Sequence, residues 1–376
     1  MIVRKKQEIF LCLGLLILPS VASLLLGMAL QGGSVQHVPF EVLDHDQSSL
    51  SQSLLRYIAE NDTFRLLGQA NSDEQVYEEL KNGDIAAAII IPAGFGKSLT
   101  RGDSPQVITL YDGTQMAAIG MVKSKVMEIL LTLRMGYLSE VFQKTLHIPP
   151  AQSLLALRPV TAEVRYLGNP EKNTAHFFLN GILLNITQIA VYILAIELYQ
   201  KPHSRRFFSD LLARGLLLGL AGMVSAALAM LIQAQFFYFP WRGSVPAALL
   251  LIFSHMVVIA NTGTLLRIVL QKTLRAVTLS NLVMLMLLLS GYIYPVSAMP
   301  WFFRLVAQVV PFTYSAAPVR DILLLGYGWT DILPDWGRLL VFWLMSAVLL
   351  GYLSRRMVKQ IQPAEPEAEG GEVPSC

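Results

Sequence analysis

Six stretches of roughly 20 residues, each nearly free of charged side chains, constrain this chain more than any other feature of its sequence. A helix needs about 20 apolar residues to cross the ~30 Å hydrocarbon core of a bilayer, so each stretch is long enough to span a membrane. Only 15% of the residues are charged, against about 25% in soluble domains. The sequence therefore predicts a polytopic membrane protein and excludes a soluble globule. The predicted spans are Ile9–Leu30, Phe177–Ile196, Gly215–Tyr238, Val245–Leu266, Val277–Ile293 and Gly337–Leu353.

Basic residues next to the spans predict their orientation. The apolar run of the first span has 22 residues, whereas a signal-peptide core has about 7–15, so an uncleaved anchor is favoured over a cleaved signal. With the N-terminus inside, twelve Lys and Arg residues flank the spans on the cytoplasmic side and four lie in short outer loops, as the positive-inside rule expects. Both termini are then cytoplasmic. The inner set is Arg4, Lys5, Lys6, Lys201, Arg205, Arg206, Arg267, Lys272, Arg275, Arg355, Arg356 and Lys359, and the outer set is Arg242, Arg304, Arg320 and Arg338.

These features predict the domain organisation. Residues 1–30 hold the cytoplasmic start and the first span, and residues 31–175 form an extracytoplasmic α+β domain. Residues 176–356 hold spans two to six with a re-entrant outer segment at 294–326, and residues 357–376 form a disordered acidic cytoplasmic tail. The expected fold is a membrane all-α bundle of six transmembrane helices with an α+β extracytoplasmic domain inserted between helices 1 and 2.

The 31–175 segment has the alternating patterns of a small folded domain. Buried or half-buried strands are expected where short apolar runs end at turn residues, and helices where a Ser precedes an amphipathic run. The last helix is long enough to pack along a neighbour or along its own twin. The expected strands are Val38–Leu43, Thr63–Leu67, Ile85–Ile91 and Gln106–Tyr111, and the expected helices are Ser48–Glu60, Ser72–Asn82 and Gln115–Leu146.

Two motifs in this segment suggest ligand sites, but a structural interpretation is favoured for both. Gly94–Ser98 resembles a phosphate-binding loop, yet Ile91 stands where that loop requires glycine. We expect a turn after a buried strand instead. Asp44, His45 and Asp46 include cation-ligand types, but neighbouring side chains at a strand end point to opposite sides. A cap for the helix that follows Ser48 is the preferred role, with a cation site as the alternative.

Neutral polar residues inside the spans are candidates for the lining of a transport pathway. In hydrocarbon each of them has to find a partner or face water, and hydrogen bonding between helices is the alternative role for each residue. The spans have no interior Asp, Glu, Lys or Arg, which argues against an ion-coupled carrier. Ser254-His255 has no acidic residue in its span to orient the imidazole, so an intramembrane enzyme is not expected. The candidate lining residues are Asn180, Thr187, Gln188, Asn261 and Thr264.

The segment after the fifth span carries the most informative motifs. Four prolines divide it into two amphipathic pieces that are too short to span, and its aromatic residues suit the outer membrane interface. We expect these pieces to re-enter the outer leaflet and to cover the pathway. The residues that define this motif are Gly291, Pro295, Pro300, Pro311, Arg320 and Gly326.

Together these residues resemble the permease subunits of type 2 ABC (ATP-binding cassette) exporters, in the branch with a large extracytoplasmic domain after the first helix. The outer-loop pattern of that family matches Ser290–Pro300, Pro311–Tyr314 and Arg320–Gly326, and the domain matches it at Ile91-Pro92 and Asp112–Thr114. The resemblance implies a homo- or heterodimeric permease in the bacterial inner membrane that works with two cytoplasmic ATPase subunits. It also implies export of a hydrophobic or amphipathic substrate, with a periplasmic membrane-fusion adaptor as in several relatives. ATP would bind the partner subunit, so no cofactor, catalytic residue or nucleic-acid partner is expected for this chain.

Two departures from the family pattern lie on the expected ATPase side. Only eight residues precede the first span, and the loop after the second span lacks the Gly-Thr of relatives. A short amphipathic helix in the loop from Glu197 to Leu212 is the expected ATPase contact, with a lipid-contacting helix as the alternative. The shortened loops also favour a second reading, a membrane scaffold or receptor that acts through its outer domain. The candidate coupling residues are Glu197, Arg205, Arg206, Phe207 and Phe208.

Overall fold

The computed structural model describes residues 2–30, 37–101, 103, 105–113, 116–146, 167–170, 173–200 and 207–361. The chain divides into two compact units. One unit, the helical unit, consists of Met1–Gly33 and Tyr166–Cys376, and the other, the α+β unit, consists of Ser34–Arg165. Each unit has its own apolar core, so each is described by itself. Arg205, Arg206 and the acidic tail lie outside the described residues.

The α+β unit is built on a four-stranded mixed sheet with the order β2-β1-β3-β4. The central strand β1 (Val38–Asp44) pairs in parallel with β2 (Phe64–Gln69) and β3 (Ala87–Ile91). The last strand, β4 (Ile108–Tyr111), is antiparallel to β3. All four strands lie within one or two residues of their predicted positions, because each is bounded by turn residues that periodicity locates well.

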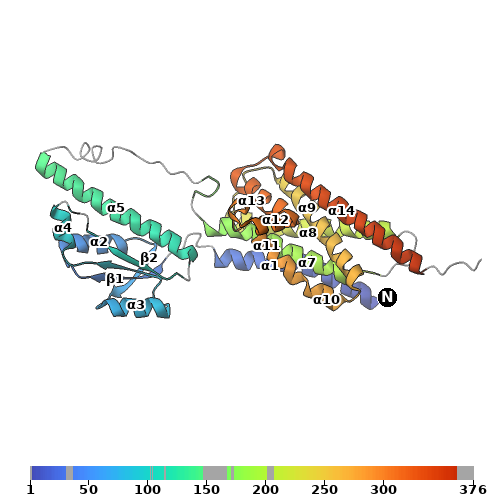
Figure 1. Ribbon diagram of the computed structural model, residues 1–376, viewed down its shortest axis with the longest axis horizontal. Coiled ribbons are helices and arrows are strands. Elements are labelled where there is room, and N and C mark those ends of the chain that lie inside the picture. The colour runs from blue at the N-terminus through green and yellow to red at the C-terminus, as the bar shows by residue number, and fades with distance from the viewer. Residues whose placement is uncertain are drawn as a thin grey trace, which may run out of the picture. The chain divides into compact units, whose positions relative to one another are not determined.

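Helices cover both faces of this sheet, as Figure 1 shows. Helices α2 (Ser49–Ala59), α4 (Phe95–Arg101) and α5 (Met116–Leu146) lie on one face, and α3 (Asp73–Asn82) lies on the other. One apolar row of α5 is therefore buried against the sheet and α2 of its own unit, which supplies the neighbour that the sequence led us to expect for this long helix. The buried members of that row are Val122, Val126, Ile129 and Leu133.

The region around Gly94 differs from the prediction. Gly94–Ser98 was expected to be a turn, but α4 begins there at Phe95. Its N-terminus is stabilised from a distance of 50 residues by Asp46, whose Oδ2 accepts the backbone N–H of Gly96 at 2.9 Å. Burial favours the neutral form of Asp46, but hydrogen bonds from Ser48 and from the backbone N–H groups of Gly94, Phe95 and Gly96 outweigh it and hold the pKa of Asp46 below its usual value.

Asp44, Asp46 and Ser48 act as helix and turn caps rather than as a cation site. Asp44 accepts the Ser51 hydroxyl at 2.7 Å, and the Ser48 hydroxyl accepts the backbone N–H of Ser51 at 3.2 Å at the start of α2. Within the described part of the chain, no three His, Cys, Asp or Glu residues are grouped to hold a metal ion.

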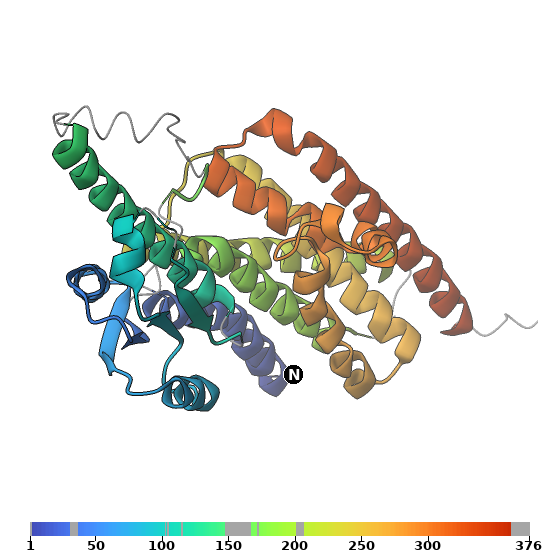
Figure 2. The same cartoon turned by 60° about the vertical axis from the view of Figure 1, so that its left-hand side comes forward.

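Four described helices of the helical unit are long and apolar enough to cross a membrane. They are α7 (Thr174–Glu197), α8 (Phe207–Phe237), α9 (Val245–Leu270) and α14 (Trp329–Ile361), of which Trp329–Val358 is the candidate span. Each contains one of the predicted spans. Figures 1 and 2 show α14, in red, along the side of this unit, where it packs on α9.

The first predicted span is also helical, and it packs closely on α8. Helix α1 (Ile2–Ala29) contacts α7 and α8. Ser23 donates its hydroxyl to the carbonyl of Ala229 at 2.7 Å, and Gln233 Nε2 donates to the carbonyl of Ser23 at 2.6 Å. Gly27 provides the close approach, because a Cβ atom there would clash with the Phe237 ring. Small residues and side-chain hydrogen bonds are the usual means of joining helices in a membrane.

The fifth predicted span is interrupted. Val277–Ile293 was expected to be one helix, but the structure has α10 (Thr273–Thr278) and α11 (Ser280–Leu289). The interruption is a single residue, Leu279, whose φ of −73° and ψ of −5° stay in the right-handed helical region. Apolar composition alone does not signal this break.

The segment after α11 contains short helices, as predicted. The 3₁₀ turns η1 (Val296–Ala298) and η2 (Pro311–Tyr314) flank α12 (Trp301–Val309), and α13 (Ala316–Leu325) follows them. At 1.5 Å per residue, α12 and α13 are only about 15 Å long, half of what a span requires. Helix α12 exposes most of its apolar side chains, whereas α13 is packed into the core of the unit.

Candidate transport pathway and coupling region

A buried polar cluster joins α7, α9 and α11 near the middle of the helical unit. Gln188 on α7 is fully buried, and its Oε1 lies 2.9 Å from Nε2 of His255 on α9. Its Nε2 donates to the Asn185 side chain and, at 3.3 Å, to the carbonyl of Val283 on α11. His255 also packs edge-on against Phe312 of η2 at a ring distance of 5.4 Å. The cluster therefore links three long elements to the segment after α11.

The other predicted lining residues are also buried or bonded to their own chain. Thr187 and Thr264 each donate to the carbonyl four residues earlier, and Asn261 donates to the Ser346 hydroxyl on α14 at 3.0 Å. Asn180 is 1% exposed, and its side-chain nitrogen and oxygen have no partner among the described residues. The structure thus assigns hydrogen bonds within the chain to four of the five residues.

The segment after α11 is fixed to α7 by Tyr292. Its hydroxyl accepts the backbone N–H of Gly181 at 3.0 Å and donates to the carbonyl of Phe177 at 2.7 Å. In a regular helix these two backbone groups bond to each other, because they belong to residues i and i−4. The tyrosine hydroxyl therefore bridges a backbone pair of α7. A Cβ atom at Gly181 would lie 2.6 Å from Cζ of the ring, so the approach requires glycine.

Arg320 on α13 holds Tyr292 from the other side. Its Nη1 donates to the Tyr292 carbonyl at 3.0 Å, and its Nη2 pairs with Asp321 at 3.0 Å. The guanidinium carbon lies 5.5 Å from the centre of the Phe177 ring and 5.1 Å from that of Tyr292. Cation–π contacts of this kind gain strength where water is excluded. Arg320 thus connects α7, α13 and the turn after α11.

The remaining residues of the predicted outer motif shape the chain around this contact. Gly291 and Gly326 have φ angles of +82° and +83°, in the left-handed region that favours glycine. Pro295 and Pro300 precede η1 and α12, and Pro311 begins η2. The motif therefore defines a set of turns and helix starts.

The predicted coupling helix is the first turn of α8 rather than a separate element. Phe207 is 3% exposed and packs with Leu211, Ile268 and Leu350 in a small core of its own. Phe208 is 36% exposed and lies over Gly351 of α14. Glu197, the last residue of α7, is exposed. The two phenylalanines thus have different environments, which helical periodicity alone does not separate.

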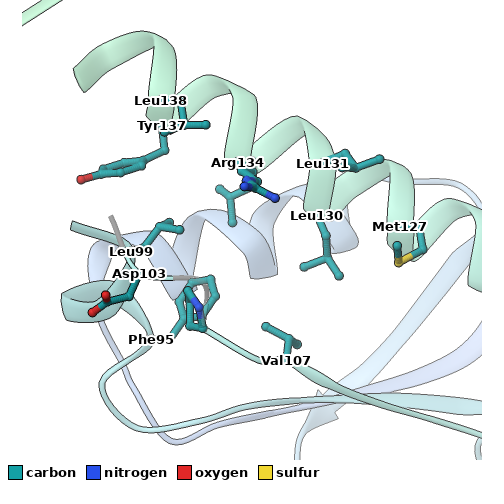
Figure 3. A pocket seen from close by; sticks show the side chains of 12 residues that line it. Phe95, Leu99, Asp103, Val107, Met127, Leu130, Leu131, Arg134, Tyr137 and Leu138 are labelled. Carbon is teal, nitrogen blue, oxygen red and sulfur yellow. The ribbon is translucent and has the colours of Figure 1, made fainter. Parts of the chain in front are cut away.

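Two cavities accompany these elements. One, of about 340 Å³, lies in the α+β unit between α5 and the segment that runs from α4 to β4, as Figure 3 shows. Its walls are largely apolar, with Asp103 and Arg134 as the charged groups. This lining suits an apolar group better than a metal ion or a phosphate. The other, of about 310 Å³, lies between the end of α7, the first half of α8 and Thr264 of α9.

Sequence reasoning missed two residues that connect elements far apart in the chain. Tyr292 was part of the outer motif, but nothing in its pattern indicates that its hydroxyl reaches α7. His255 was noted only as a lone intramembrane histidine. The signal that was available is the glycine at position 181 in an otherwise bulky span, since a glycine inside a helix often marks a close approach.

Comparisons with known proteins identify the family. The family model for ABC-2 family transporter proteins matches residues 9–352. The probable multidrug ABC transporter permease YbhS of Escherichia coli (strain K12) is 23% identical over 277 residues, which cover 68% of this chain and 69% of that protein. The linearmycin resistance permease protein LnrN of Bacillus subtilis (strain 168) is 22% identical over 350 residues, which cover 86% of this chain and 89% of that protein. The chain therefore belongs to the ABC-2 transporter family and is a membrane component of an ABC transporter.

Proposed function

We propose that the chain is the permease of an ATP-driven exporter. It crosses the bacterial inner membrane six times, with both termini in the cytoplasm and the α+β unit outside. The observation that carries this proposal is the electrical neutrality of the bundle interior. In the described part of the helical unit, no Asp, Glu, Lys or Arg side chain is fully buried, and the one buried histidine, His255, is bonded to the neutral amide of Gln188. Ion-coupled carriers use titrating intramembrane groups, so the energy for transport comes from a partner ATPase.

Two features support a proposal for the substrate class: the buried residues of the helical unit and the names of the relatives. The buried residues of the unit are largely apolar, with a few neutral hydrogen-bonding groups. The relatives are named for multidrug transport and for linearmycin resistance. We propose a hydrophobic or amphipathic substrate that leaves the cytoplasm or the inner membrane. An adaptor of the membrane-fusion type is the proposed partner of the α+β unit.

A second copy of the chain, or a paralogue, completes the pathway in this proposal. Four of the five predicted lining residues bond within their own chain, which leaves little polar surface for a pathway inside one copy. Helix α14 exposes a long apolar face that includes Val341, Leu344 and Val348. A pathway between two copies is consistent with both features.

The proposed ATPase contact is the end of the bundle that carries Glu197 and Phe208. Both side chains are exposed there, and Arg205 and Arg206 adjoin them in the sequence. Phe207 fixes the first turn of α8 in place, because it is buried against residues of α9 and α14. An exposed aromatic beside basic residues suits a groove with acidic edges.

Substitution of the two phenylalanines separately tests the coupling. Phe208→Ala is expected to reduce co-purification of the ATPase and substrate-stimulated ATP hydrolysis while the permease stays folded. Phe207→Ala is the matched control, and it is expected to lower thermal stability because it empties a buried site. If Phe208→Ala leaves both ATPase readouts unchanged, the contact lies elsewhere and a scaffold or receptor function gains support.

Thiol labelling tests the topology. In a background that lacks Cys12 and Cys376, single cysteines replace Glu60 in the α+β unit and Lys272 between α9 and α10. Both positions are exposed. A membrane-impermeant maleimide added to intact spheroplasts should label position 60 and leave position 272 unlabelled until the membrane is opened. Labelling of both positions in intact spheroplasts would contradict the proposed orientation.

A further inference from the structure

The cavity at the end of α7 opens onto the surface of the helical unit rather than into its core. It has a volume of about 310 Å³, within the range of small-ligand sites. Leu198 and Tyr199 form its end, and Leu217, Leu218 and Ala221 of α8 form an apolar wall. Leu217 is 65% exposed, so the groove faces the medium that surrounds the helices. In a membrane protein that medium is the acyl region of the bilayer.

One arginine lines this groove, and a second lies against one of its wall residues. Arg214 lines the groove and donates Nη1 to the carbonyl of Leu198 at 3.0 Å, which leaves its other N–H groups without an acceptor among the described residues. The guanidinium carbon of Arg267 lies 5.5 Å from the centre of the Tyr199 ring, and that ring belongs to the groove wall. Two positive charges therefore adjoin one apolar groove.

Among the described residues, neither guanidinium forms an ion pair with a carboxylate. Across the described parts of the chain, no Asp or Glu oxygen lies within 4.0 Å of Arg214 or Arg267, although Asp210 stands one turn before Arg214 on α8. A positive charge near hydrocarbon needs an anionic or strongly polar partner. The groove thus combines an exposed apolar wall with two arginines that have no carboxylate partner among the described residues.

We propose that this groove binds one anionic phospholipid of the inner leaflet. One acyl chain lies along Leu217, Leu218 and Ala221, and the phosphate meets Arg214 and Arg267. Basic pockets between transmembrane helices on the cytoplasmic side bind acidic headgroups in this way. The placement in the inner leaflet rests on the proposed orientation of the chain, whereas the binding itself rests on the groove and its charges.

A phospholipid fits the groove better than a loop of the ATPase does, because it matches both the positive charge and the exposed apolar wall. An acidic loop of the ATPase could match the arginines, but it would not fill an apolar wall that opens sideways with a 65% exposed Leu217. A phospholipid satisfies both ends of the groove with one molecule. It is also present at this surface at all times.

Native mass spectrometry of the full-length protein tests the proposal. The protein is purified in a mild detergent and incubated with phosphatidylglycerol or with phosphatidylcholine of the same chain length. Wild type is expected to retain phosphatidylglycerol at least tenfold better than phosphatidylcholine. The double variant Arg214→Gln/Arg267→Gln should lose this preference. The matched control Arg355→Gln/Arg356→Gln removes the same charge from exposed positions near the C-terminal end of α14 and should keep it.

A second variant separates lipid binding from folding. Ala221→Phe fills the apolar wall without changing any charge, and it should lower phosphatidylglycerol retention while Arg214 keeps its bond to Leu198. Thermal unfolding without lipid shows whether each variant is folded. Equal losses in the Arg355/Arg356 control, or no preference in wild type, would overturn the proposal.

The same variants distinguish this proposal from the transport function. ATPase co-purification is measured alongside lipid retention. Loss of lipid with normal co-purification supports the lipid site. Loss of co-purification with unchanged lipid retention would mean that the groove contacts the ATPase, and it would overturn the lipid site but not the exporter function. Thiol labelling at position 272 separately tests whether the site lies in the inner leaflet.

Discussion

The bridge between Tyr292 and α7 makes Gly181→Ala the most informative single substitution in the helical unit. A Cβ atom at this position would lie 2.6 Å from Cζ and 2.8 Å from Cδ1 of the tyrosine ring, and the ring is 1% exposed. The ring therefore has to move. Its hydroxyl then loses the contacts to the Gly181 N–H and the Phe177 carbonyl, which are 3.0 Å and 2.7 Å long.

The expected cost follows from three contributions. Two lost hydrogen bonds are worth about 1 kcal/mol each, and forcing extra volume into a packed site costs about 1–3 kcal/mol. Alanine is about 1 kcal/mol better than glycine inside a helix, which offsets part of this loss. The free energy of unfolding should therefore fall by about 2–4 kcal/mol. Gly337→Ala is the matched control, because a Cβ atom there meets no atom within 4 Å.

A double-mutant cycle in mixed detergent micelles measures this effect. Unfolding by SDS titration gives the free energy for wild type, Gly181→Ala, Tyr292→Ala and the double variant. If the ring causes the loss, Gly181→Ala should cost nothing, or even stabilise, once Tyr292 is alanine. An unchanged cost in the Tyr292→Ala background would refute the reasoning, since the clash would then lie with another group.

Three further predictions use the same preparations. Burial and the neighbouring Glu79 raise the pKa of Glu41 from 4.5 to about 7. Between these two pH values the folded state holds a proton that the unfolded state releases, so the free energy of unfolding falls as the pH rises from 4.5 to 7. At pH 8 the β1 amides of Glu41→Gln should therefore be better protected against hydrogen exchange than those of wild type, once intrinsic exchange rates are corrected for. At pH 4.5 the two proteins should be protected equally. Substitution of an exposed residue, Glu78→Gln, should change the protection at neither pH. Arg320→Lys should lower the free energy of unfolding by about 1–2 kcal/mol, because lysine lacks the planar group that both bonds and stacks; no change would show that charge alone suffices. Gln233→Leu should cost about 1 kcal/mol through lost hydrogen bonds to α1, and a gain in stability would contradict the role of these bonds.

Periodicity and turn chemistry predicted the secondary structure well where local signals decide it. The strands of the α+β unit and the caps at Ser48 and Ser72 were confirmed, because alternation and capping are encoded within a few residues. Helix α4 was missed, since its N-terminus is stabilised by Asp46 from 50 residues away. The one-residue interruption at Leu279 between α10 and α11 was also missed, because it lies inside an apolar run and leaves no mark in hydropathy.

The candidate site could be predicted only as a set of residue types. Polar residues in the spans were recognised, but their partners depend on how helices pack. Gln188 meets His255 across 67 residues, and Asn261 meets Ser346 across 85. No spacing rule connects positions so far apart, so the partners of these residues had to come from the structure. The different environments of Phe207 and Phe208 could not be predicted either, because they also depend on how the helices pack.

The hydrogen bonds between α1 and α8 join two helices that the ribosome makes at very different times. Ser23 and Gln233 are 210 residues apart. At 5–20 residues per second, the ribosome needs roughly 10–40 s to make the second partner after the first. Throughout that interval Ser23 lacks the amide that later bonds to it, while the whole α+β unit and α7 are made. The contact between α1 and α8 therefore forms late, after most of the chain that separates the two helices has already been synthesised.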